Sequence, residues 1–390
     1  MAMITKAVAY SAIVVLFAGF GYSARAAHSE SGQVRARLME FFGERTSLLY
    51  NCLPRDCERA SSFTNGWREW SASFGYGRGM EDSAIMNGIA LVWAVDSGED
   101  AFARQMARGL INLATAHRKR GFVARGLCLE DGKSACTLSS RDQITHFVHG
   151  LYHWSTSGRC DEAMKGEIAS AIGALADRML ANITAENDYN ALTADDKIDP
   201  KGIMKMWEVR PHEAARLPMI YLAAARLTGE KRFAEAYERY IDRALAESAR
   251  LPEIPAETLK HTMPGYAFLQ MNASIELICR ADSARSARAA AIMRETARMA
   301  ADRFIAGRGE DGPWLSAAGD LALAIALASD DSGLERLLGK KRARQVRELF
   351  ADCLAGRSGQ MPLAAAWPSR IVALKAAECR FGASSANKGE

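Results

Sequence analysis

The chain has 390 residues, of which 49% are hydrophobic and 25% are charged, with 31 Gly, 10 Pro and a formal net charge of +4. The apolar content and the mixed charge exclude a disordered polymer, and the low Pro and Gly content excludes collagen-like sequence. A net charge this small, without a long run of Lys or Arg, gives no electrostatic footprint for a nucleic-acid partner. The length suits one large domain or two medium ones, with ample chain for a core.

The first 27 residues have the layout of a secretory signal peptide. Lys6 precedes a mostly apolar run at 7–20, and small residues follow at 24–27. The apolar run is shorter than the roughly 20 residues that span a bilayer, so we predict a signal peptide at 1–27 that is cleaved on export. We expect a periplasmic or secreted protein with no membrane span after cleavage, in which residues 28–390 form a single domain.

The eight cysteines all lie after the predicted cleavage site. An even number of cysteines in an exported chain is compatible with disulfides. The near neighbours Cys52 and Cys57, and Cys128 and Cys136, are the predicted pairs. Other cysteines in apolar helical patterns are equally compatible with buried thiols. None of the eight forms the Cys-x-x-Cys motif of zinc ribbons or thioredoxin-like proteins.

Helical periodicity and helix-favouring residues extend along nearly the whole chain. The predicted helices are 32–50, 82–95, 99–119, 141–156, 161–183, 212–227, 230–249, 266–280, 285–305, 315–328, 333–355 and 367–380.

The connectors between these helices alternate in length. Short connectors with Gly or acidic residues, such as 96–99 and 228–230, follow the even-numbered helices and suit tight antiparallel hairpins. Long loops precede the even-numbered helices, which are the more apolar ones, whereas the odd-numbered helices carry charge on one face. We therefore predict an all-α fold, an (α/α)6 toroid of six helical hairpins with apolar helices inside. A superhelical solenoid is the alternative.

In such a ring, the amino ends of the inner helices and the long loops surround one cavity. The segment 139–154 enters the second inner helix there. At about 100° per residue, its residues Asp142, His146, His149 and His153 lie on one stripe opposite an apolar face. Three interpretations stay open: Asp142 as general acid or base with His146 as its modulator, histidines that share a metal ion, or a structural stripe.

A structural interpretation also exists for each candidate carboxylate. Ser139 and Asp142 have the spacing of a capping box. Asp82 lies in the first turn of the preceding inner helix, where a negative charge is favourable at the positive helix end. Two carboxylates at equivalent places in successive hairpins are also what glycosidic cleavage needs, one to protonate the leaving oxygen and one to activate water or stabilise a cation. We predict Asp82 and Asp142 as the catalytic pair.

The long loops supply candidates for substrate binding, because aromatic faces stack on sugar rings and Arg pairs with carboxylates. The loop 67–79 interleaves aromatic residues, Gly and Arg, and 207–212 leads into the third inner helix. Weaker candidates are Tyr266, Gln270 and Asn272. The predicted substrate-binding residues are Trp70, Arg78, Asn87, Gln143, His146, His149, Trp207, Arg210, His212 and Trp314.

Several common catalytic motifs are absent from the sequence. It contains no P-loop, no Gly-x-Gly-x-x-Gly, no Gly-x-Ser-x-Gly and no His-Glu-x-x-His. Phosphoryl transfer, dinucleotide redox and serine hydrolase chemistry therefore lose their usual sequence support. We assign no cofactor and no metal site.

The chain resembles the six-hairpin glycosidase superfamily, the (α/α)6 toroids found among carbohydrate-active enzymes. The segment Asp82-Ser83-Ala84-Ile85-Met86-Asn87 is similar, with one extra residue, to the Asp-Ser-x-Met-Asn segment of unsaturated glucuronyl hydrolases. Ser140-Arg141-Asp142-Gln143, followed by Gly150, looks like the Ser-x-Asp-Gln…Gly helix of uncharacterised bacterial toroids. The first resemblance implies an acid/base role for Asp82. Fold alone does not give function, so the residues themselves must carry the argument.

The leading hypothesis is an exported enzyme that cleaves glycosidic bonds of oligo- or polysaccharides, which include acidic ones. A polysaccharide lyase that acts on uronate-containing glycans is the first alternative, with Asn87, Arg210, His212 and Tyr266 as its candidates. A non-catalytic saccharide-binding protein of the cell envelope is the second.

Overall fold

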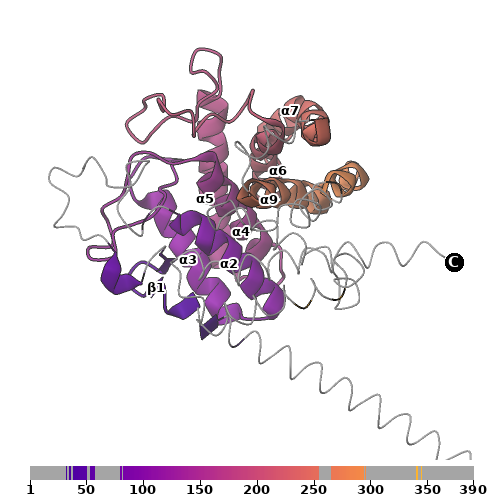
Figure 1. The fold of residues 1–390 in the computed structure, drawn as a ribbon. Coiled ribbons are helices and arrows are strands. Elements are labelled where there is room, and N and C mark those ends of the chain that lie inside the picture. The colour runs from indigo at the N-terminus through magenta and orange to yellow at the C-terminus, as the bar shows by residue number, and fades with distance from the viewer. Residues whose placement is uncertain are drawn as a thin grey trace, which may run out of the picture.

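The computed structural model of the protein describes residues 32, 35–36, 38–50, 53–57, 80, 82–253, 265–293, 295, 340 and 344. These residues form a mostly helical structure, as the sequence predicted, together with one small antiparallel sheet that was not predicted (Figure 1). The α-helices with described bounds are α2 (Ser83–Ser97), α3 (Asp100–Thr115), α4 (Arg141–Ser155), α5 (Glu162–Asn182), α6 (Arg216–Thr228), α7 (Lys231–Ala249) and α9 (Gly265–Ala281).

The core consists of helices that are buried on nearly all sides. Almost every residue of α2 and α4, and the first two-thirds of α6, is buried. Helix α4 packs against α2, α6 and α9, with α2 and α3 on one side of it and α6, α7 and α9 on the other (Figure 1). A helix that buries its whole circumference needs neighbours all round, which is why α4 occupies the centre of this layer.

Helices α2 and α4 run in the same direction. Gln143 at the start of α4 bonds to Asp82, which directly precedes α2. Near the other end, His153 bonds to Asp96. The amino ends of both helices therefore lie at one end of the structure.

Helices α6 and α9 share this direction. Arg216 at the start of α6 pairs with Asp142 at the start of α4. Close to the end of α6, Arg226 donates to the carbonyl of Ala281, the last residue of α9, at 2.8 Å. The 3-10 helix η4 (Pro211–Glu213), which precedes α6, also packs on α9. All four core helices thus have their amino ends on one side.

Amphipathic helices cover this layer. Helix α3 packs on α2, α5 and α7 pack on α6, and each exposes a charged face. The turns after α2 and α6 contain Gly98 at φ 76° and Gly229 at φ 73°, left-handed conformations that a residue without Cβ adopts easily. The tight hairpin turns predicted at these two places are confirmed.

The predicted helix at 32–50 is wrong over its second half. Two short antiparallel strands lie there instead, β1 (Phe42–Gly43) and β2 (Leu48–Leu49). The physical reason is tertiary: three successive side chains, Leu48 to Tyr50, are all buried, which one face of a surface helix cannot achieve. Packing against the core helices thus outweighs the local helical pattern of the sequence in this segment.

The structure also bears on the predicted disulfides and on the membrane. Cys128 and Cys136 do not form the predicted disulfide, and the described Cys57, Cys160 and Cys279 are thiols as well. None of the helices in the described part of the chain has both the length and the apolarity needed to cross a membrane.

Several features predicted from the sequence lie outside the described residues. They are the signal peptide at 1–27, the cysteine Cys52 of the other predicted pair, the helices 315–328 and 367–380, and most of 285–305 and 333–355.

Helices α2 and α4 touch at two glycines. A Cβ on Gly88 would lie 2.2 Å from the backbone oxygen of His146, and a Cβ on Gly150 would lie 2.8 Å from Cα of Gly88. Real Cβ atoms do not come this close to backbone, so the two helices can approach to this distance only because both positions are glycine.

We expect Gly88→Ala to force α2 and α4 apart and to lower the free energy of unfolding by at least about 2 kcal/mol, the scale of overpacking in a dense core. Urea unfolding followed by circular dichroism measures this change. Gly166→Ala is the matched control, because Gly166 is exposed on α5 and an added Cβ meets nothing within 4 Å. There the higher helix propensity of Ala should raise stability by about 0.5–1 kcal/mol. Equal effects in the two variants would contradict the close approach.

Candidate active site

Asp82 and Asp142 lie at the amino ends of α2 and α4, which are adjacent and parallel. Their side chains are 28% and 25% exposed, respectively. The Arg side chains that pair with them are far less exposed, at 9% for Arg125 and 2% for Arg216. Each carboxylate is thus held from inside the protein and open on another side, which is the arrangement an incoming ligand requires.

Two donors in the described part of the chain hold Asp82. Its Oδ1 accepts hydrogen bonds from Nη2 of Arg125 at 3.1 Å and from Nε2 of Gln143 at 2.8 Å. It occupies the N-cap position of α2 without a side-chain capping bond. Asp82 thus lies at the positive end of α2, as the structural interpretation expected, but its described bonds are to side chains rather than to the backbone of its helix.

Gln143 connects Asp82 to the helix that follows it. This fully buried side chain donates to Asp82, while its Oε1 accepts from the backbone N–H of Ile85 at 3.2 Å. Both ends of the amide are used inside the protein. Gln143 was predicted to bind substrate; its contacts instead make it a residue that positions Asp82.

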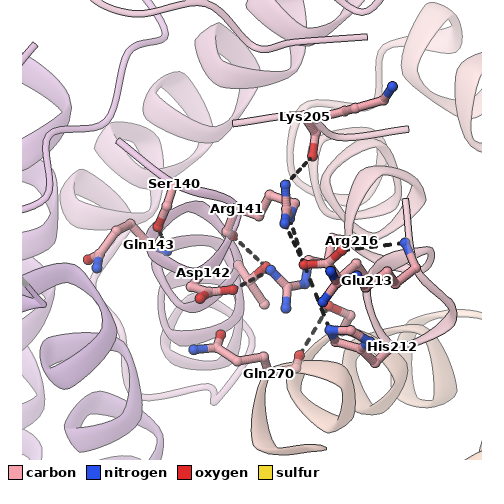
Figure 2. A network of polar contacts seen from close by, with 12 residues as sticks. Ser140, Arg141, Asp142, Gln143, Lys205, His212, Glu213, Arg216 and Gln270 are labelled. Atoms are coloured by element: carbon pink, nitrogen blue, oxygen red, sulfur yellow. Dashed lines mark hydrogen bonds and ion pairs between the residues drawn. The ribbon is translucent and has the colours of Figure 1, made fainter. Parts of the chain in front are cut away.

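Asp142 forms an ion pair with Arg216 of α6 (Figure 2). The capping-box interpretation of Ser139 and Asp142 does not hold, because the N-cap of α4 is Ser140, whose hydroxyl accepts from the backbone N–H of Gln143. The carboxylate of Asp142 therefore does not cap the amino end of α4.

The charges around Asp142 favour its ionised form. Burial raises the pKa of this carboxyl group, but the positive charges of Arg216 and Arg141 more than offset that effect and leave the pKa below its usual range. At neutral pH Asp142 is an anion. It is suited to accept a proton or to stabilise a positive charge, and unsuited to donate a proton.

A second ion pair lies beside Asp142 (Figure 2). Arg141 donates from Nε to Oε1 of Glu213 at 2.8 Å and from Nη1 to the carbonyl of Lys205 at 3.1 Å. Burial raises the pKa of Glu213, and the charges of Arg216 and Arg141 outweigh this and lower it. These bonds fasten the long loop before α6 to the start of α4.

The histidine stripe of α4 faces the neighbouring core helices. His149 bonds to Oε2 of Glu276 on α9 at 2.7 Å, and His153 bonds to Oδ1 of Asp96 at 3.0 Å and contacts Arg280. Burial raises the pKa of Glu276, but its bond to His149 and the nearby positive charge lower the pKa by more than burial raises it. The result is a pKa well below the usual range. The structural interpretation of the stripe therefore fits these contacts.

The remaining histidine of the predicted site does not face outward. His146 is 1% exposed and lies at the point where α2 approaches α4. Over the ranges that the structure describes, no three His, Cys, Asp or Glu side chains are grouped so as to hold a metal ion. His146 and His149, both predicted to bind substrate, are buried in helix–helix contacts.

Asn87 is another predicted binding residue with a structural role. It is fully buried, its Oδ1 accepts from the backbone N–H of Leu49 at 2.8 Å, and its Nδ2 donates to the carbonyls of Ser47 and Met106. All of these partners belong to the β-hairpin and α3. Asn87 therefore joins α2 to the structure behind it.

Trp207 does not present an open aromatic face. It is 7% exposed, its ring centroid lies 4.6 Å from that of Tyr240, and the guanidinium of Arg243 lies over it. Arg210 donates its backbone N–H to Glu213, and His212 is 5% exposed in η4. Both thus lie beside Glu213, which pairs with Arg141 next to Asp142. Trp70, Arg78 and Trp314 lie outside the described residues.

Sequence reasoning missed the partners of the two aspartates. These are Arg125 for Asp82 and Arg216 for Asp142; the neighbouring ion pair of Arg141 and Glu213 was missed as well. For Arg216 a signal existed, since it is a single charge at the start of the apolar segment 217–225. A charged residue that enters a buried helix is expected to have an opposite charge nearby.

No protein-family model matches the chain, and no curated protein matches it. The chemistry of the site is therefore interpreted from its own geometry.

We expect stability to fall as the pH drops from about 6.5 to about 4. Burial lowers the pKa of His153 and of His212 from 6.5 to about 4 each. In this range the unfolded chain binds protons that the folded protein does not. Each histidine therefore lowers the free energy of unfolding by up to about 1.4 kcal/mol per pH unit of acidification. Urea unfolding at pH 7, 6 and 5 measures the slope, and His153→Gln should make it shallower. A variant slope equal to that of the wild type would contradict the assignment.

Proposed function

We propose that the protein is an exported enzyme that cleaves glycosidic bonds, with Asp82 and Asp142 as its acid/base pair. The observation that carries the proposal is the pair itself: two partly exposed carboxylates at the amino ends of adjacent parallel helices, each held from inside by a buried Arg. Glycosidic cleavage needs two carboxyl groups in different environments.

The environments suggest how the two groups divide the work. Asp142, whose pKa is lowered, takes a proton from the attacking water or stabilises the positive charge that develops on the sugar. By elimination, we assign to Asp82 the transfer of the proton to the leaving oxygen. Gln143 follows Asp142 in the chain and bonds to Asp82, so it fixes one carboxylate relative to the other.

The proposal extends to the architecture and to the substrate. Four parallel core helices covered by amphipathic helices are what an (α/α)6 toroid would show over this part of the chain, and the resemblance to six-hairpin glycosidases points the same way. Acidic oligosaccharides are included among the substrates because of the resemblance to unsaturated glucuronyl hydrolases, since Arg125, Arg141 and Arg216 at the carboxylate end are each already paired with a carboxylate of the protein. The pattern at 1–27 supports export.

We expect Asp82→Asn and Asp142→Asn each to lower kcat by a factor of about 100 or more, since each removes one proton-transfer group. The assay measures reducing ends released from maltohexaose, cellohexaose, xylohexaose, hexagalacturonate and a chondroitin hexasaccharide. Asp100→Asn is the matched control, because it makes the same change at the exposed start of the outer helix α3.

Three outcomes separate the hypotheses. Full turnover in both variants would contradict the assignment of the pair. A product with the ultraviolet absorbance of a new C=C bond would instead indicate a polysaccharide lyase. Saccharide binding without turnover, unaffected by Asp142→Asn, would indicate a non-catalytic binding protein.

A further inference from the structure

Three buried polar atoms in the Asp142 cluster have no hydrogen-bond partner within the described part of the chain. They are Oε1 of Gln270 on α9, Nε of Arg216 on α6 and Nδ1 of His212 in η4. Gln270 is 1% exposed. Figure 2 shows its side-chain amide pointing from α9 toward Asp142, with Arg216 and His212 on the same side of α4.

Buried amides in the described core fall into two groups: Asn272, also on α9, likewise has an Oδ1 without a partner among the described residues, whereas others are fully bonded. Gln143 and Asn87 are fully buried too, yet the oxygen and the nitrogen of each have protein partners. A buried acceptor without a donor lowers the stability of the folded protein, so such groups are rare unless something else binds them. The unpartnered Nε of Arg216, which pairs with Asp142, lowers the stability of the folded protein in the same way.

The three atoms and Asp142 together match one kind of ligand group. The Nε of Arg216 donates, Oε1 of Gln270 accepts, and the carboxylate of Asp142 accepts. A hydroxyl group can accept one hydrogen bond and donate another at the same time. His212 has a lowered pKa and is uncharged at neutral pH, so its ring adds a neutral partner for a second hydroxyl.

We propose that Gln270, Arg216 and His212 form a subsite that binds the hydroxyl groups of a saccharide next to Asp142. The subsite rests on the proposed function and adds to it: Gln270 becomes a substrate-binding residue on a helix that carries neither catalytic carboxylate. Binding at this place would hold the sugar ring against Asp142, where the positive charge of the reaction develops.

The test uses Gln270→Met, which keeps the length of the side chain and removes its polar atoms. Kinetics are measured on whichever hexasaccharide of the panel the wild type cleaves, and stability is measured by urea unfolding without ligand. We expect KM to rise about tenfold, the effect of one lost hydrogen bond, while the urea midpoint stays equal or rises. A purely structural amide would give the opposite pattern.

Gln105→Met is the matched control, since it makes the same change at an exposed position of α3. Gln270→Leu is the second variant, and it is used if Gln270→Met does not fold. Unchanged KM and kcat in the Gln270 variant, with an active wild type, would overturn the subsite and leave the proposed function intact. A clearly lowered urea midpoint would overturn it as well, because the amide would then have protein partners. If the wild type neither cleaves nor binds any hexasaccharide of the panel, the proposed function fails and the subsite with it.

Discussion

The contact between α2 and α4 at Gly88 and Gly150 is the constraint on which the rest of this structure depends. Because neither residue has a Cβ, the two backbones come into direct contact along the middle of the helices. Their amino ends are then close enough for Gln143 of α4 to reach both Asp82 and the backbone of Ile85. A wider separation would break this connection and move the two carboxylates apart.

Around this contact the core contains an unusual amount of charge, and it is compensated in two separate groups. At the amino ends, Asp82, Asp142 and Glu213 pair with arginines. Toward the other ends, His149 and His153 pair with acids from α9 and α2. Removing one partner leaves a buried charge or a buried polar group without its bond, so both groups also hold the helices in one register.

The two groups differ in what remains open. In the second group, both histidines bond to carboxylates of neighbouring helices, and the side chain of Glu276 is only 5% exposed. In the first group, Asp82 and Asp142 keep partly exposed carboxylates, and Gln270 and Arg216 keep unpaired atoms. Asp142 thus combines a partly exposed carboxylate with neighbouring polar atoms that have no partner in the described part of the chain, which is a feature of binding sites rather than of structural networks.

Much of this organisation follows from local features of the sequence. Helical periodicity located α2 to α7 to within a few residues, and the left-handed Gly98 and Gly229 ended helices where a tight turn was expected, because these effects depend on neighbouring residues alone. The placement of Asp82 and Asp142 at helix starts is local in the same sense.

Which partner each polar side chain finds is not local. Gln143 and Asn87 were expected to face a ligand, yet their amides bond to segments far away in the chain. The strands at 42–43 and 48–49 replaced a helix because α2 and α3 bury three side chains in succession there. Arg216 acquired its role from a helix 74 residues earlier. The sequence by itself therefore determined the helices and their order, whereas packing between distant segments decided which side chains hold the core together and which are left to bind a ligand.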